Sequence, residues 1–140
     1  MPPSPKPNKV GYTPTAYDWL YLPSKGRKGK TPAMPTLVEW SDDDRAYWRQ
    51  LWRMPQAMAW EALGHEEFVA RLVALRAAFR ESQSPRVSAE MRQLEDRLGL
   101  NPKSMMQLRW RIVEDEVQAR RQPVDIPGSS ARDRLRSVGS

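Results

Sequence analysis

The segment SKGRKGKT, residues 24–31, ends in the Gly-Lys-Thr that also ends a nucleotide-binding phosphate loop. A phosphate loop needs the pattern G-x-x-x-x-G-K-[ST] between a strand and a helix, because its backbone N–H groups hold the phosphates at the helix N-terminus. Ser24 replaces the first glycine, and we expect no apolar strand before it. Pro32 and Pro35 prevent a helix from continuing after Lys30. The segment is therefore predicted to be a mobile basic loop, not a nucleotide site.

A basic loop of this kind is suited to the phosphates of a nucleic acid. The predicted phosphate contacts are its four cations, Lys25, Arg27, Lys28 and Lys30. No carboxylate pair, nucleophile with a base, or metal-ligand cluster is visible in the sequence. The single histidine, His65, is expected to begin a helix. We therefore predict a non-enzymatic protein that needs no cofactor and no metal.

Charge and proline divide the 140 residues into three segments. Residues 1–40 hold six Lys/Arg, two acids and eight prolines, which is typical of a flexible arm. An aromatic patch in the arm is expected to dock on the core; it consists of Tyr12, Tyr17, Trp19 and Tyr21. Residues 41–122 have a nearly balanced charge and helical periodicity, and residues 123–140 are expected to form a disordered tail. The prediction is one all-α domain between two flexible ends.

The chain has no cysteine, no apolar N-terminal run and no stretch of about 20 apolar residues. These features predict a soluble intracellular protein without a membrane segment.

Five helices are expected in residues 41–122. Ser41 can cap the first, which Pro55 ends; the second covers residues 55–63, and the third covers residues 66–82. Ser88 is expected to cap the fourth helix, and Asn101 followed by proline begins the fifth. Three arginines in the region of the first helix repeat every four residues; they are Arg45, Arg49 and Arg53. This row either contacts phosphates or forms a solvated face paired with nearby acids.

The fourth and fifth helices could form a helix-turn-helix, with Gly99 in the turn. A plain helical hairpin that serves packing alone is the alternative. In the first case the outward, DNA-facing residues are Lys103, Ser104, Gln107 and Arg111. The fifth helix also has a second apolar face, which is predicted to contact a neighbouring subunit and consists of Met106, Trp110 and Val113.

The order and spacing of several short motifs resemble the small terminase subunits of tailed bacteriophages, particularly those of actinobacterial phages. The motifs are Leu22-Pro23 through Gly26-Arg27-Lys28-Gly29, then Leu51-Trp52-Arg53-Met54-Pro55-Gln56 with Trp60, and Arg92 through Pro102 followed by Met105, Leu108, Arg109 and Trp110. Together they cover residues 22 to about 116, and they leave out the start of the arm and the tail.

The resemblance implies a non-catalytic subunit that assembles as a helical ring, binds double-stranded viral DNA at the packaging site and recruits the large ATPase and nuclease subunit. It also implies a location in the cytoplasm of the infected bacterial host. Two other classes stay open. A helix-turn-helix transcription regulator would bind a palindromic operator as a dimer. A structural or scaffold protein of the capsid would carry an incidental basic arm and show no DNA affinity at low salt.

Overall fold

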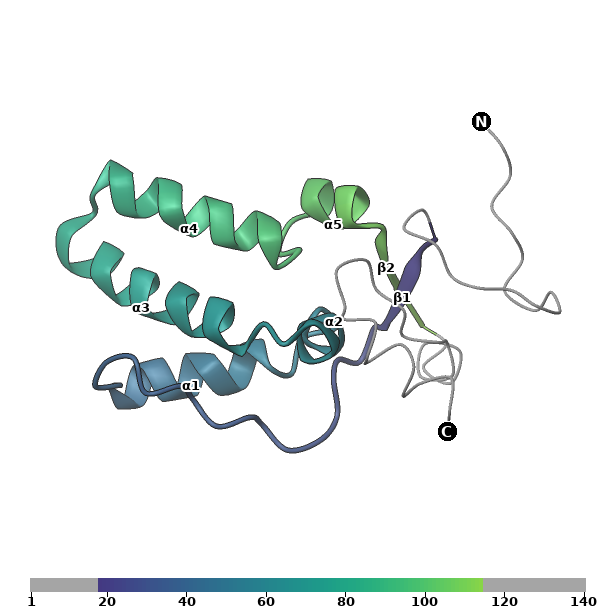
Figure 1. Ribbon diagram of the computed structural model, residues 1–140, viewed down its shortest axis with the longest axis horizontal. Coiled ribbons are helices and arrows are strands. Elements are labelled where there is room, and N and C mark those ends of the chain that lie inside the picture. The colour runs from purple at the N-terminus through teal and green to yellow at the C-terminus, as the bar shows by residue number, and fades with distance from the viewer. Residues whose placement is uncertain (1–17, 115–140) are drawn as a thin grey trace, which may run out of the picture.

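The computed structural model describes residues 18–114 as five helices and two short strands (Figure 1). The elements follow in the order β1 (Leu20–Pro23), α1 (Asp42–Leu51), α2 (Ala57–Leu63), α3 (Glu66–Ser82), α4 (Pro85–Arg97), α5 (Pro102–Leu108) and β2 (Trp110–Val113). The predicted tail at residues 123–140 lies outside the described residues, as do Tyr12 and Tyr17. The described residues are mostly helical, but the short two-stranded sheet means that they are not all-α.

Local capping signals set most of the helix ends. The Ser41 side chain accepts a hydrogen bond from the Asp44 N–H, and the Asp44 carboxylate accepts one from the Ser41 N–H, which completes a capping box at the start of α1. Gly64 ends α2 in the left-handed conformation, and Asn101 caps α5. The predicted bounds of α3 are confirmed.

The predicted start of α4 was wrong. Ser84 caps this helix, because its side chain accepts a hydrogen bond from the Arg86 N–H, and Pro85 occupies the first turn. Ser88 lies one turn inside the helix.

The core is built around three tryptophans from α1, α2 and the turn between them. Trp48, Trp52 and Trp60 are at most 2% exposed. The rings of Trp48 and Trp52 lie 5.5 Å apart, and those of Trp52 and Trp60 lie 5.7 Å apart with their edges toward the faces. Aromatic pairs at these separations add stability beyond the apolar area they bury.

Two side chains from this region hold the turn between α4 and α5. The Trp60 indole N–H donates to the Leu98 carbonyl at 2.8 Å, and the Gln56 amide donates to the Gly99 carbonyl at 3.1 Å. Gly99 has a φ of +68°, and a Cβ added there would lie 2.4 Å from the Trp110 ring. This position therefore requires glycine both for its backbone conformation and for space.

The strands β1 and β2 form a parallel pair in which Leu20 lies opposite Trp110 and Pro23 lies opposite Val113. This pair contradicts two expectations. An apolar strand does precede the basic loop, and the fifth helix does not continue through Trp110. Arg109 adopts a left-handed conformation with φ of 61°, which ends α5 and turns the chain into β2. No described helix is long and apolar enough to cross a membrane.

Candidate nucleic-acid interface

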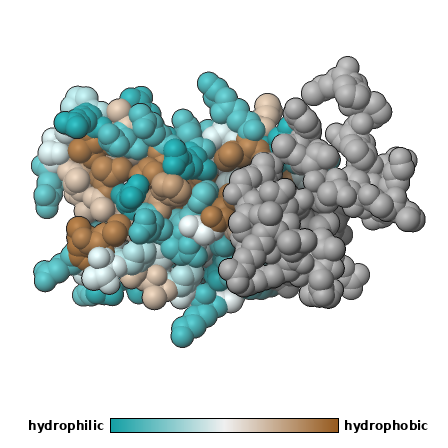
Figure 2. Space-filling view, in the orientation of Figure 1, coloured by the Kyte–Doolittle hydropathy of each residue, from teal (hydrophilic) through white to brown (hydrophobic). Residues whose placement is uncertain are grey.

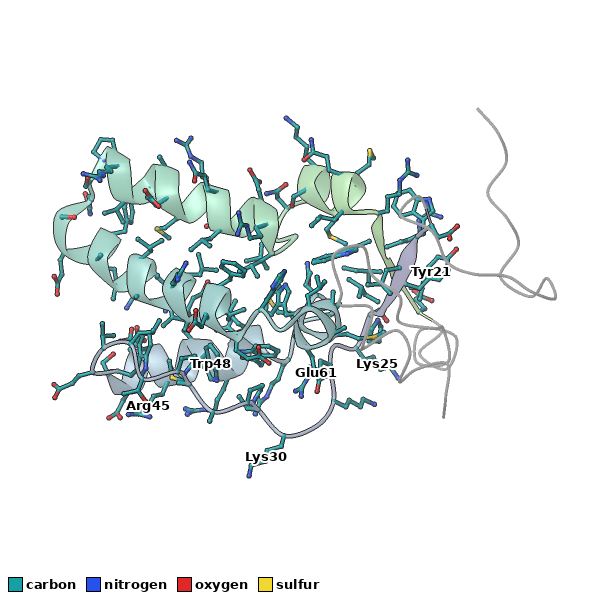
Figure 3. The ribbon with its side chains drawn as sticks, viewed as in Figure 1. Tyr21, Lys25, Lys30, Arg45, Trp48 and Glu61 are labelled. Atoms are coloured by element: carbon teal, nitrogen blue, oxygen red, sulfur yellow. The ribbon has the colours of Figure 1, made fainter. Side chains whose placement is uncertain are left out.

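Residues 24–40 pack along α1 instead of extending as an arm. Leu22, just before this segment, is fully buried. The Arg27 N–H donates to the Met54 carbonyl at 3.3 Å, and the Trp48 indole N–H donates to the Pro32 carbonyl at 2.7 Å. The composition of residues 1–40 predicted a mobile arm, but the part from residue 18 onward is anchored to the core by these contacts. The basic loop is therefore held in place beside α1 (Figure 3).

Gly26 supplies the sharp turn of the loop. Its φ is +89°, and a Cβ added there would lie 1.8 Å from the Arg53 carbonyl oxygen. Glycine at position 26 is thus needed for close packing of two backbones. The next helix begins at Asp42, well after Lys30, so no helix N-terminus faces the loop lysine.

Arg27 points inward rather than toward solvent, in contrast to its predicted role as a phosphate contact. Its Nε donates to Glu61 Oε2 at 2.9 Å and its Nη2 donates to Glu61 Oε1 at 3.2 Å. Nη2 also donates to the Lys30 carbonyl at 3.2 Å, and the guanidinium lies 5.6 Å from the centre of a Trp52 ring. Only 9% of the Arg27 side chain is exposed. Arg27 therefore fixes the shape of the loop, through a bidentate ion pair that sequence alone could not reveal.

The other cations of the loop are exposed, and the arginine row of α1 and the turn after it lies beside them. Gly26 contacts the Arg53 carbonyl at one end of the loop, and Pro32 lies against Trp48 farther along. In Figure 3, Lys30 and Arg45 lie on the lower edge of the molecule, and Lys25 lies above them near the end of β1. We call this surface the basic face; its residues are Lys25, Lys28, Lys30, Arg45, Arg49 and Arg53, all exposed.

Three acids near the basic face are engaged elsewhere, whereas Glu39, Asp42 and Glu114 are exposed. Glu61 pairs with Arg27, Asp44 belongs to the capping box of α1, and Asp43 pairs with Arg76 and Arg80 of α3. Within residues 18–114, Arg45, Arg49 and Arg53 form no direct ion pair, so the row is solvated but not paired with local acids. The basic face therefore keeps positive charge that an external anion can approach.

The four residues predicted to face DNA differ in exposure and in the element that carries them. Lys103 and Gln107 are exposed on α5, as predicted. Ser104 is 2% exposed; its hydroxyl donates to the Asn101 carbonyl at 3.0 Å, so it completes the helix cap. Arg111 lies on β2, where its guanidinium stacks 4.5 Å from the centre of a Trp19 ring. The docking predicted for Trp19 is thus realised against a strand that the sequence did not reveal.

The predicted subunit-contact residues do not share a face. Met106 is 70% exposed, but Trp110 is 3% exposed and packs against Gly99. Val113 is half-buried in β2. The prediction assumed a helix through Val113; because the helix ends at Leu108, Trp110 turns into the core of its own chain instead.

Two side chains have perturbed pKa values. Burial raises the pKa of Tyr47, whereas the Arg76 guanidinium, 4.0 Å from the ring centre, acts in the opposite direction. Burial lowers the pKa of His65, and the charge of Arg97 lowers it further. His65 lies directly before α3, as predicted. No cluster of metal-binding side chains occurs among the described residues.

Comparisons of the chain with protein-family models, with curated proteins and with solved structures found no match.

Proposed function

We propose that this chain is a small terminase subunit, the non-catalytic DNA-recognition component of a phage packaging machine. The observation that supports the proposal most is the basic face. An anchored loop, the first helix and the turn after it present six exposed cations, and no acid in the described residues forms an ion pair with the three arginines among them. Such a surface is suited to the regularly spaced phosphates of duplex DNA.

In this proposal the basic face binds the DNA backbone. The helix α5 lies on the opposite edge of the molecule in Figure 1, so it approaches base edges as a separate contact. Lys103 and Gln107 are its exposed polar residues. Lysine can donate to guanine and glutamine can pair with adenine in the major groove. Ser104 is left out of this contact set because it is buried, and Arg27 is left out because Glu61 neutralises it.

The remaining parts of the proposal follow from the sequence resemblance. Copies of the chain assemble into a ring around or beside the viral DNA in the cytoplasm of the infected bacterium. The large subunit supplies ATP hydrolysis and DNA cleavage. Its docking is assigned to residues 123–140 on their composition, since a short apolar stripe there can fold into a partner's groove.

The experiment compares two double charge reversals. Lys25→Glu/Lys30→Glu changes the basic face, whereas Arg86→Glu/Arg92→Glu changes two exposed arginines of α4. The net-charge change is the same, so long-range attraction falls equally in both. The first variant is expected to lose duplex affinity, measured by fluorescence anisotropy at low salt, by at least tenfold more than the second. Equal losses would contradict a DNA contact at the basic face.

A further inference from the structure

The loop before α1 carries two exposed aliphatic side chains. Leu37 is 43% exposed and Val38 is 52% exposed, and an exposed acid, Glu39, follows them. Large aliphatic side chains at neighbouring positions on a surface often mark a contact with another molecule. We call these three residues the knob.

The knob is held by contacts on both sides. The Trp40 indole N–H donates to the Pro35 carbonyl at 2.9 Å, and the Leu37 N–H donates to the same carbonyl at 3.0 Å. Farther back, the Pro32 carbonyl accepts from Trp48. A segment fixed in this way loses little conformational freedom when it binds.

A groove of about 410 Å³ lies between α3 and α4. Its apolar lining comes from Phe68, Ala74, Leu75 and Leu94. Figure 2 shows hydrophobic residues gathered over these two helices among hydrophilic ones. A groove of this size can accept aliphatic side chains from a partner.

The rim of the groove is positively charged. The guanidiniums of Arg71 and Arg97 lie 5.7 Å and 4.7 Å from the centre of the Phe68 ring, and Glu90 is the one acid in the lining. Arg71 pairs with Glu67 at 3.8 Å. Arg97 forms no ion pair within residues 18–114. The groove therefore selects an apolar segment with a carboxylate beside it.

The knob has this chemistry, but it cannot reach the groove of its own chain. Figure 1 shows the segment before α1 on the α1 side of the molecule, with α3 between α1 and α4. A second copy of the chain can supply the knob. We propose that Leu37 and Val38 of one copy enter the α3–α4 groove of the next, with Glu39 close to Arg97.

Because the knob and the groove are different surfaces, every copy that gives its knob to one neighbour keeps its groove for another. Repetition of such a contact produces a closed ring if the rotation closes, or a filament if it does not. This inference rests on the proposed function for its oligomeric state, and it replaces the contact predicted through Trp110.

The test uses two variants that are defective on opposite surfaces. Leu37→Asp/Val38→Asp destroys the knob, and Arg71→Glu/Arg97→Glu reverses the rim of the groove. Leu37 and Val38 are exposed, so the knob variant should keep the helix content and melting temperature of the parent. The groove variant loses the Arg71–Glu67 pair and two contacts with Phe68, so it should keep its helix content but melt at a lower temperature. By native mass spectrometry the parent chain should form an assembly of many copies, and each variant alone should be a monomer of 16.2 kDa.

An equal mixture of the two variants should form a heterodimer of twice the chain mass and nothing larger. The intact knob of the groove variant enters the intact groove of the knob variant, and the two defective surfaces are left over. Retention of the parent mass by either variant, a mixture that stays monomeric, or a parent chain that is itself monomeric would each overturn the inference.

If the groove variant loses its helix content, an exchange of the charges of Glu39 and Arg97 tests the same contact. Glu39→Arg, on the exposed loop, should weaken assembly roughly tenfold or more, because like charges then meet at the rim. Adding Arg97→Glu to the same chain should restore it. Assembly unaffected by Glu39→Arg, or not restored by the second change, overturns the inference. The DNA affinity of the monomeric variants tests the proposed function separately, because the basic face is intact in all of them. Absence of the predicted knob contact, with DNA binding retained, would count against this inference alone.

Discussion

Replacement of Arg27 by alanine should destabilise the fold, although Arg27 lies in a loop of lysines and glycines. The change removes two hydrogen bonds to Glu61, one to the Lys30 carbonyl and the stacking on Trp52. Glu61 is 58% exposed, so solvent weakens the ion pair toward the range of surface pairs, about 0–1 kcal/mol. The carbonyl hydrogen bond contributes about 1 kcal/mol and the cation–π contact about 0.5–1 kcal/mol.

Together these terms predict a loss of about 1.5–3 kcal/mol for Arg27→Ala. In a folded unit of this size, about 1 kcal/mol shifts the melting temperature by roughly 4–8 °C, so Tm should fall by roughly 6–24 °C. Thermal unfolding followed by circular dichroism measures the shift. Lys30→Ala is the matched control, because it removes a loop cation but keeps the carbonyl, and it should stay within about 0.5 kcal/mol of the parent.

Arg27→Lys separates charge from geometry. Lysine keeps the positive charge but cannot form the bidentate pair, so this variant should lie between the parent and Arg27→Ala. A melting temperature for Arg27→Ala equal to that of Lys30→Ala would refute the structural role of Arg27.

Two further predictions concern Trp110 and His65. Trp110→Asp should abolish cooperative unfolding, followed by near-UV circular dichroism, because it puts a charge into the core and removes a buried ring worth about 3–5 kcal/mol. The control Met106→Asp, at a site 70% exposed, should unfold like the parent. A folded Trp110→Asp monomer would contradict the burial of Trp110. The stability that neutral His65 contributes should be fully present above about pH 6.5, the pKa in the unfolded chain, and should be lost as the pH falls toward the lowered folded pKa, because the unfolded chain then binds more protons. His65 is the single histidine, so His65→Gln should flatten the dependence of stability on pH between about 7.5 and 5.5, measured by urea unfolding; an unchanged slope would show that His65 is not responsible.

Sequence predicted the features that local chemistry determines. Ser41, Gly64 and Asn101 mark helix ends through contacts within a few residues, and all three were predicted. Pro85 indicates the start of α4, because proline favours the first turn of a helix. The cap is Ser84, and the predicted cap, Ser88, lies one turn later.

The features that depend on distant residues were missed. The strands β1 and β2 have four residues each, too few to show an alternating pattern, and they pair across nearly the whole described chain. Arg109 ends α5 in a conformation that usually requires glycine or asparagine, so no signal marked the end of that helix. Arg27 and its partner Glu61 are 34 residues apart. For these reasons the interior positions of Arg27 and Trp110 could not be derived from spacing.

The central claim is that the basic face binds DNA phosphates, and a salt titration of duplex affinity tests it most directly. Each phosphate contact contributes about 0.9 to the slope of log affinity against log salt concentration. Alanine in place of Lys25, Lys30, Arg45, Arg49 and Arg53 should therefore lower the slope by up to about 4.5, with Arg27 kept so that the loop retains its shape. The variant Arg86→Ala/Arg92→Ala should keep the parent slope. A slope that is the same in the five-residue variant and the parent would contradict the claim.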